Sequence, residues 1–457
     1  RYGFLSDFTE KDRDNGALEW LLKCHINLVQ FYDWSYRHDS LVAPQEDYHD
    51  MMGKEISGST VKAKIAKAKA LGMHPTAYGA VYAASEPFFE KHPTWAFYNS
   101  CQEPFVFIDV FYIMNIAEGS PWRKHLFEEY QSAISMMGFS GIHMDTYGFP
   151  KTAYSHLDAI PKKIKLENEL PTLIDETREN VHGEEEPYLI FNNVGAWPVQ
   201  RTADRKQDAV YIEVWPPYDR YASIAQLIRD ARTYARDDKS IILAAYLKPF
   251  REGKREKALP AAKLLMGSIV SNGATHLLTG ENQTALTQGY YSDYTKFSDS
   301  EAEAIRRYYD YMIRYENLFF DPELQDVTMT HTGWDNYEYQ CTSHKVSSYG
   351  EAGKIWMILR EKDYRKCIYL LNLCGQSEDY WNEGKEEPNI QKDIKFTVQV
   401  DTPVEKICFS TPDGKNMDAV ELLFTERATR TGKFIDFTVP SLNYWTTIWI
   451  DTRKETI

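Results

Sequence analysis

The sequence has no long hydrophobic run and none of the common cofactor or metal motifs. No stretch of about 18 apolar residues occurs in its 457 positions, so we expect no transmembrane helix and no membrane partner. A P-loop, an H-E-x-x-H motif and a G-x-G-x-x-G motif are all missing, and we therefore expect neither a cofactor nor a metal ion. The six cysteines lie far apart without a C-x-x-C pair, which is unlike a zinc site or a dense disulfide framework.

Basic residues are too few to balance the acidic ones. The chain has 52 Lys and Arg against 67 Asp and Glu, which gives a formal net charge of −15. An acidic protein repels a phosphate backbone, so we expect no nucleic acid partner, whereas a neutral substrate is compatible with this charge. No signal peptide is present, but an apparent strand follows Arg1 at once, which indicates a chain trimmed of its leader. We expect a secreted monomer, with the cytoplasm as the alternative compartment.

Aromatic residues, in contrast, are abundant. They make up 14% of the chain, with 31 Tyr and 11 Trp. Their flat apolar faces and polar edges suit the binding of sugars, but the same side chains also pack into ordinary cores. Composition alone leaves both interpretations open.

Strand-like and helix-like segments alternate over the first 320 residues. Strand-like runs occupy eight segments: 1–8, 26–34, 73–82, 141–148, 187–193, 208–215, 240–248 and 274–281. Helical patterns lie at 60–71, 122–137, 222–236, 260–271 and 300–317. Eight strands with intervening helices predict a (β/α)8 barrel, a TIM-type α/β fold. A doubly wound sheet is the main rival, but no glycine-rich phosphate turn follows the first strand.

The remaining segments define an excursion and a second domain. The apolar run 105–113 lies within 83–120, which is too long for a simple loop. We interpret 83–120 as an excursion on the catalytic face, with a miscounted barrel strand as the alternative. After residue 322, short strand-like runs follow one another without helices, which is typical of an antiparallel β-sandwich. We therefore predict a catalytic barrel over 1–321 and a C-terminal sandwich over 322–457.

The eight predicted strands nearly all end in polar or aromatic residues, which predicts a polar cup at the C-terminal rim of the barrel. Two carboxylates stand out there, Asp145 after the fourth strand and Glu213 after the sixth. Hydrolysis of an acetal needs one carboxylate at the anomeric carbon and a second that protonates the leaving oxygen. A catalytic pair is one interpretation, and structural ion pairs at the rim are the other. The competing carboxylates are Asp7, Asp33 and Glu281.

Other residues near the strand ends are candidates for substrate binding. Trp215 shares a strand face with Glu213, either as a platform for a sugar ring or as part of the core. His143 stands in the same relation to Asp145, and either contacts substrate or orients its neighbours through hydrogen bonds. Lys248 is either a donor to a sugar hydroxyl or a surface lysine. The predicted substrate-binding residues are Asp33, Trp34, Arg37, His38, Tyr78, His143, Asn193, Trp215, Lys248, Glu281 and Asn282.

Six segments together resemble glycoside hydrolase family 66, which contains dextranases and cycloisomaltooligosaccharide glucanotransferases. These segments are "RYGFLSDF", "FYDWSYRH", "GFSGIHMDTYG", "FNNVG", "YIEVWPP" and "HLLTGE". The resemblance covers the whole barrel. It implies that Asp145 in the "D-T" motif is the nucleophile and that Glu213 in the "E-x-W" motif is the acid/base. It also implies a retaining mechanism through a covalent glucosyl-enzyme, with α-1,6-glucan (dextran or isomaltooligosaccharides) as the substrate.

Two departures from the family pattern bear on the expected activity. Family members usually carry an immunoglobulin-like domain before the barrel, whereas this chain starts at the first barrel strand. Cyclising members carry a carbohydrate-binding module late in the barrel, and residues 240–320 leave no room for one. We therefore expect an endo-acting dextranase. A cyclising or disproportionating glucanotransferase is the alternative, and a non-catalytic carbohydrate-binding barrel is the second alternative.

Overall fold

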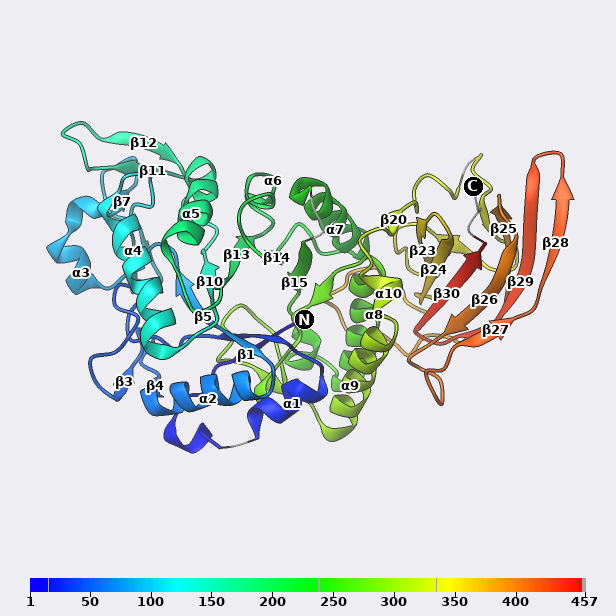
Figure 1. Ribbon diagram of the computed structural model, residues 1–457, viewed down its shortest axis with the longest axis horizontal. Coiled ribbons are helices and arrows are strands. Elements are labelled where there is room, and N and C mark those ends of the chain that lie inside the picture. The colour runs from blue at the N-terminus through cyan, green and yellow to red at the C-terminus, as the bar shows by residue number, and fades with distance from the viewer. Residues whose placement is uncertain (15, 237–238, 334, 454–457) are drawn as a thin grey trace. The chain divides into compact units, whose positions relative to one another are not determined.

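A computed structural model describes residues 1–14, 16–236, 239–333 and 335–453, and its chain divides into two compact units (Figure 1). The first unit contains 1–216, 230–246 and 277–296, and the second contains 217–229, 247–276 and 297–457. The two units interleave along the chain, so they do not test a single boundary at Asp321–Pro322. That boundary stays a prediction.

The first unit is built on a parallel barrel, which confirms the predicted fold class. Seven strands pair in parallel in the order β1-β2-β5-β10-β13-β14-β15. Residues 277–280 close the ring, because the Leu277 N–H donates to the Leu243 carbonyl and Gly280 pairs in parallel with Phe4. The strands are β1 (Tyr2–Leu5), β2 (Leu28–Phe31), β5 (His74–Ala80), β10 (Gly141–Asp145), β13 (Tyr188–Val194), β14 (Ala209–Glu213), β15 (Ser240–Ala244) and β17 (Thr279–Gly280).

Helices follow the strands at the positions that the helical patterns predicted. In Figure 1, α2, α4 and α5 lie on the outer side of the barrel strands. Helix α2 (Gly58–Ala70) buries Val61, Ile65 and Ala68, so its apolar stripe faces inward. The other helices with predicted counterparts are α4 (Pro121–Ser132), which continues as a π-helix over Ala133–Met137, α7 (Tyr221–Ala235), α8 (Ala258–Ser271) and α9 (Asp299–Arg314).

Shorter elements complete the first unit. They are α1 (Ala17–Lys23), β3 (Asp47–His49), β4 (Glu55–Ser57), α3 (Glu86–Lys91), β7 (Phe97–Tyr98), β11 (Thr152–Ser155), β12 (Lys162–Lys165), α6 (Val199–Thr202), β18 (Thr284–Ala285) and β19 (Thr295–Lys296). A long helix, α5 (Leu166–Asn180), lies between β10 and β13 in the chain and was not among the predicted helical patterns. Among the barrel strands, β10 depends on a glycine where it meets β13. A Cβ atom at Gly141 would lie 2.3 Å from the Tyr188 carbonyl oxygen, so a larger residue there would push the two strands apart.

The apolar run 105–113 belongs to an excursion and not to the barrel. It forms β8 (Val106–Phe107) and β9 (Phe111–Ile113), which pair in antiparallel fashion with each other, and β9 pairs with β6 (Ala83–Ala84). The interpretation of 83–120 as an inserted excursion therefore holds, and the alternative of a barrel strand was wrong.

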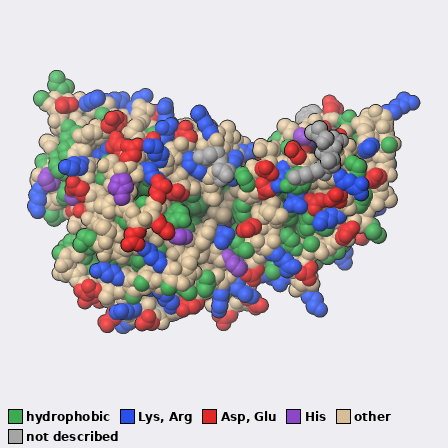
Figure 2. Space-filling model, in the orientation of Figure 1, with side chains coloured by type: hydrophobic (Ala, Val, Ile, Leu, Met, Phe, Trp, Pro, Cys, Tyr) green, Lys and Arg blue, Asp and Glu red, His purple; other side chains and the backbone are tan. Residues whose placement is uncertain are grey.

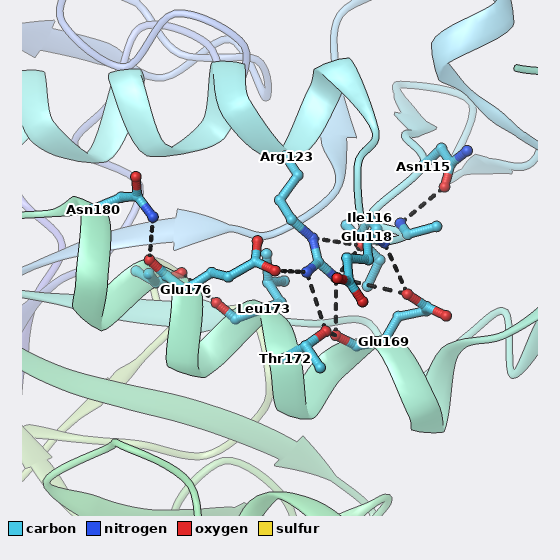
Figure 3. A network of polar contacts seen from close by, with 11 residues as sticks. Asn115, Ile116, Glu118, Arg123, Glu169, Thr172, Leu173, Glu176 and Asn180 are labelled. Atoms are coloured by element: carbon cyan, nitrogen blue, oxygen red, sulfur yellow. Dashed lines mark hydrogen bonds and ion pairs between the residues drawn. The ribbon is translucent and has the colours of Figure 1, made fainter.

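Arg123 on α4 ties the end of this excursion to helix α5 (Figure 3). Its guanidinium donates to the Ile116 carbonyl at 2.6 and 2.9 Å, to Thr172 Oγ1 at 3.1 Å and to Glu176 Oε1 at 2.9 Å. The Glu118 N–H donates in turn to the Glu169 carboxylate at 2.9 Å. Because Arg123 is almost fully buried, these bonds satisfy a charge that would otherwise be costly to remove from water.

The second unit contains two sheets that share an apolar core, as the predicted sandwich does, and their strands pair in antiparallel fashion except for the short parallel pair of β22 and β23. One sheet has the order β20-β23-β24-β30-β26-β27, with β22 beside β23, and the other has β21-β25-β29-β28. Side chains of both sheets meet in one apolar cluster. It includes Met357 and Leu359 on β23 and Val398 on β25. Buried and exposed residues partly alternate on β25 and β29, whereas β24 and β30 are buried along nearly their whole length.

The bounds of these elements are α10 (Glu316–Phe319), β20 (Gln325–Asp326), β21 (Tyr339–Cys341), β22 (Val346–Ser347), β23 (Ile355–Lys362), β24 (Arg365–Asn372), β25 (Gln391–Val400), β26 (Val404–Ser410), β27 (Val420–Leu422), β28 (Phe424–Thr429), β29 (Gly432–Leu442) and β30 (Trp445–Thr452). Acidic and basic side chains are interspersed over the face that Figure 2 shows. Across the described ranges, the structure contains no helix that is both long and apolar enough to cross a membrane.

Candidate active site

A cavity of about 580 Å³ lies at the C-terminal ends of the barrel strands, where the sequence predicts a polar cup. Its wall comes from most of the barrel strands and from the excursion. Both predicted catalytic carboxylates line it. The lining residues are Gln30, Tyr32, Asp33, His38, Met52, Tyr78, Phe107, Ile108, Phe111, His143, Asp145, Thr146, Tyr147, Asn192, Val194, Glu213, Trp215, Tyr246, Gly289, Tyr290 and Tyr291.

Asp145 and Glu213 are joined through Asn192. The Asn192 Nδ2 donates to Asp145 Oδ1 at 2.7 Å and to Glu213 Oε2 at 3.1 Å. These two carboxylate oxygens therefore lie no more than 5.8 Å apart, which is the sum of the two distances. The hydroxyl of Tyr78 donates to Asp145 Oδ2 at 2.7 Å, and the hydroxyl of Tyr246 donates to Glu213 Oε1 at 2.6 Å. Each carboxylate is thus held by at least two donors, which fix its orientation.

Burial changes the acidity of both groups. Each of the two residues is only 9% exposed. Burial and, second, the charge of Glu213 raise the pKa of Asp145 to about 7, although the bonds from Asn192 and Tyr78 act in the opposite direction. Burial also raises the pKa of Glu213. Burial therefore makes both carboxyl groups weaker acids than they are in water, and the charge of Glu213 adds to this effect at Asp145.

A pair that carries one proton has the chemistry that acetal cleavage needs. The ionised member can attack a carbon, and the protonated member can give its proton to a departing oxygen. The separation is compatible with the roughly 5–5.5 Å of retaining enzymes, in which no water fits between the two groups. Inverting enzymes separate their carboxyl groups more widely, by roughly 6.5–9.5 Å.

Three further predicted binding residues have unusual settings in the cavity wall. Asp33 adopts a left-handed backbone with a φ of 49°, and burial followed by repulsion from Asp50 raises its pKa to about 8. His143 Nδ1 bonds the Tyr2 hydroxyl at 2.9 Å, and burial lowers the pKa of His143 to about 3, so its ring is neutral. Burial lowers the pKa of His38 to about 4. These buried groups favour a neutral ligand.

Tyr78 and Trp215 also line the cavity, as predicted, but Trp34 does not. Trp34 is completely buried, its Nε1–H donates to the Tyr78 carbonyl at 3.1 Å, and its ring packs against Phe139. An indole enclosed in this way has no free face on which a sugar could stack. Arg37 is directed elsewhere as well, because its guanidinium donates to the carbonyls of Tyr36 and His49.

The prediction that Asn193 lies in the cavity was wrong by one position. Its side chain donates to the Tyr211 carbonyl at 2.9 Å and accepts from the Thr202 hydroxyl at 2.6 Å, inside the protein and away from the cavity. Side chains alternate across a strand, so the neighbouring Asn192 takes the opposite side and reaches the carboxylates. Val194 also lines the cavity, and counting back from it by two residues would have selected Asn192.

Three predicted binding residues do not line the cavity: Glu281, Asn282 and Lys248. Glu281 is 0% exposed and forms an ion pair with Lys64 at 2.6 Å, while it accepts the N–H groups of Ser6 and Asp7 at 2.7 Å. It therefore secures the end of β1 against α2. Asn282 has a positive φ in the turn after β17.

Lys248 belongs to the second unit. Its ammonium group pairs with Glu383 at 2.5 Å, and its N–H donates to the Asn382 side chain at 2.9 Å. The surface alternative for Lys248 is therefore the one that the structure supports.

Several lining residues are missing from the predicted set. Tyr246 bonds Glu213 directly, and its place at the end of the seventh predicted strand is the signal that could have selected it. Tyr291 follows no strand end, and its hydroxyl lies 2.6 Å from the Tyr211 hydroxyl. This contact joins residues far apart in the chain, so the local sequence pattern could not have selected Tyr291. Within the described ranges, no group of three or more His, Cys, Asp and Glu side chains is arranged to hold a metal ion.

Comparison with known proteins gives one family and a consistent fold. The profile of the family described as "Glycosyl hydrolase family 66" matches residues 1–449. Two proteins from Niallia circulans, both named cycloisomaltooligosaccharide glucanotransferase, are 22% and 20% identical. Each alignment covers 98% of this chain but only 61% of the relative, so the chain spans less than two thirds of their length.

Solved structures resemble the chain over nearly all of its residues. A cycloisomaltooligosaccharide glucanotransferase from Paenibacillus sp., crystallised with cycloisomaltoheptaose, has a TM-score of 0.89 at 18% identity, covering 98% of this chain and 84% of that one. An α-amylase from Geobacillus thermoleovorans, in complex with acarbose, has a TM-score of 0.57 at 10% identity, covering 100% and 98%. At these identities the likeness supports the fold alone.

Proposed function

The chain belongs to glycoside hydrolase family 66, and from this premise we propose that it cleaves internal α-1,6-glucosidic linkages of dextran with retention of configuration. The observation that carries the proposal is the short bridge between Asp145 and Glu213 through Asn192. It keeps one oxygen of each carboxylate no more than 5.8 Å from the other, which is compatible with a covalent mechanism, in a cavity lined with aromatic side chains.

The first half of the reaction forms a bond to Asp145. An oxygen of ionised Asp145 attacks the anomeric carbon while Glu213 gives its proton to the departing glycosidic oxygen. The carbon–oxygen bond to the leaving chain breaks, and a glucosyl ester of Asp145 remains. Donation from Asn192 and Tyr78 keeps part of the Asp145 population ionised despite burial, because both bonds favour the charged form.

The second half returns the enzyme to its starting state. Glu213, now a carboxylate, takes a proton from water, and the water oxygen attacks the anomeric carbon from the side that the leaving chain vacated. The ester bond to Asp145 breaks, so the product keeps its original configuration. Tyr246, which donates to Glu213 at 2.6 Å, keeps this carboxylate oriented through both halves.

A glucanotransferase is the second candidate, and the names of the relatives favour it. It shares the first half-reaction and differs in the acceptor, since a sugar hydroxyl replaces water in the second. A non-catalytic carbohydrate-binding barrel is the third candidate, and the presence of both carboxylates in one cavity weighs against it. A polymeric substrate supports a secreted enzyme over a cytoplasmic one.

The test compares polysaccharides and separates the products. Dextran, pullulan and soluble starch are incubated at equal glucose content, and released chains are resolved by chromatography. We expect linear isomaltooligosaccharides from dextran and little release from starch. Cyclic or lengthened products would favour the transferase, and equal release from starch would overturn the α-1,6 specificity. Asp145→Asn and Glu213→Gln, which should each lose several orders of magnitude in turnover, serve as the inactive controls.

A further inference from the structure

The tip of the β8–β9 hairpin holds Ile108 in an unfavourable backbone conformation. Ile108 and Asp109 have φ values of 48° and 58°, and the Val110 N–H donates to the Phe107 carbonyl at 3.1 Å. Two left-handed central residues closed by this bond define a type I′ turn, which favours Asn, Asp or Gly. Asp109 suits its position. Ile108 does not, because a β-branched side chain crowds the left-handed backbone.

Packing inside the protein does not account for this choice of residue. The apolar cluster around the hairpin consists of Ala80, Ala83 and Phe111 with Met51, Phe107, Val110 and Tyr147 packed against it, and Ile108 is not a member. The Ile108 side chain is 51% exposed. A strained backbone conformation that no packing interaction of the residue compensates points to a function of that residue.

The residues on both sides of Ile108 hold it in the cavity wall. The Phe107 ring stacks on Tyr147 with 4.4 Å between centroids and an interplanar angle of 26°. Phe111 is buried, and it pairs with Phe107 across the hairpin. Tyr147 follows Asp145 by two residues, so the tip is anchored to the segment that carries the predicted nucleophile. Ile108 lines the same cavity as Asp145.

We propose that Ile108 is a substrate contact, whose exposed aliphatic side chain packs against the apolar C–H face of a sugar ring when a glucan chain occupies the cavity. The inference rests on the proposed function, since it needs a carbohydrate ligand. Contact with the ligand removes the exposed apolar surface of Ile108 from water, which is a gain that the free protein does not have. The residue thus trades folding stability for affinity.

The test is a pair of substitutions in the same turn. Ile108→Asn places a residue suited to a type I′ turn at the strained position, and we expect its Tm to rise by about 1–3 °C. Its KM for dextran should rise about fivefold, as loss of one apolar contact does, with kcat changed less than about twofold. Ile108→Val keeps a β-branched apolar side chain that is one methyl group smaller, and it should raise KM much less than Ile108→Asn does.

Asp109→Gly is the matched control, because Asp109 occupies the same turn but does not line the cavity. It should keep the wild-type KM. An Ile108→Asn protein with an unchanged KM, or one with a lower Tm, would overturn the inference and leave the hydrolase proposal intact. Absence of turnover of every glucan by the wild-type protein would instead remove the proposed function, and the inference with it.

Discussion

The carboxylates of Asp145 and Glu213 share one donor, the side-chain nitrogen of Asn192, at 2.7 and 3.1 Å. This arrangement couples the two groups in position and in charge. The amide keeps these two oxygens close together, and it stabilises the ionised form of whichever member carries the charge. The proposed chemistry requires that charge to pass from Asp145 to Glu213, so a donor bonded to both can serve both steps.

Removal of the shared donor should move the pH dependence of the enzyme. In the proposed mechanism Asp145 must be ionised to attack, and the bond from Asn192 lowers its pKa, so Asn192→Ala should raise that pKa further. The acidic limb of the profile of kcat/KM should therefore shift to higher pH, and activity near pH 6 should fall at least about tenfold. Asn180→Ala removes an exposed amide on α5 and is the control. An unshifted profile would argue against the bridge.

Asp145→Asn should stabilise the protein at alkaline pH. The pKa of Asp145 is about 7 in the folded state against an ordinary value of 3.8. Between these values the folded state keeps a proton that the unfolded state has lost, so the free energy of unfolding falls as pH rises through about 7. The asparagine variant avoids this loss.

We expect Asp145→Asn to exceed the wild type by roughly 1–4 kcal/mol at pH 8, with the difference vanishing near pH 4. Denaturant unfolding at both values measures it. Asp47→Asn, at an exposed position on β3, should follow the wild-type trend. A constant difference between Asp145→Asn and the wild type at the two pH values would contradict the assigned cause.

Gly289 should be needed for the space beside Glu213. A Cβ atom at this position would lie 3.3 Å from Glu213 Oε1 and 3.3 Å from Trp215 Cζ2. Gly289→Ala should therefore displace the carboxylate and lower kcat about tenfold, because small displacements at a reacting group have large effects. Added to Glu213→Gln, the same change should cause little further loss. Full activity of Gly289→Ala would show that Glu213 and Trp215 can move to accommodate the added methyl group without lowering kcat.

The Lys64–Glu281 ion pair should be structural. Both side chains are almost completely buried, so Glu281→Gln leaves the Lys64 charge without its partner and should cost about 3 kcal/mol of unfolding free energy. The pair of Lys67 and Glu19 has a similar distance of 2.7 Å but is largely exposed, and Glu19→Gln should change stability far less. Equal losses in denaturant unfolding would show that burial does not set the contribution of the pair.

The local pattern of apolar and polar residues predicted much of the architecture. The alternation of apolar segments with helical periodicity predicted the barrel, because strand and helix periods are properties of neighbouring residues. Short strands without helices predicted the sandwich for the same reason. The motifs around Asp145 and Glu213 predicted the family, which the profile over residues 1–449 confirms. They also placed both carboxylates at strand ends, where the structure brings them together.

What the sequence by itself determined is therefore which segments form the barrel strands and which family the chain belongs to. Only the tertiary structure decided which strand-end side chains face the cavity. Trp34 became enclosed, Glu281 met Lys64, and Asn192 rather than Asn193 reached the carboxylates. Closure of the barrel determines each of these outcomes through contacts between residues far apart in the chain. A shift of one residue along a strand moves each side chain to the opposite face of the sheet. The local sequence pattern therefore cannot determine which strand-end side chains point into the cavity.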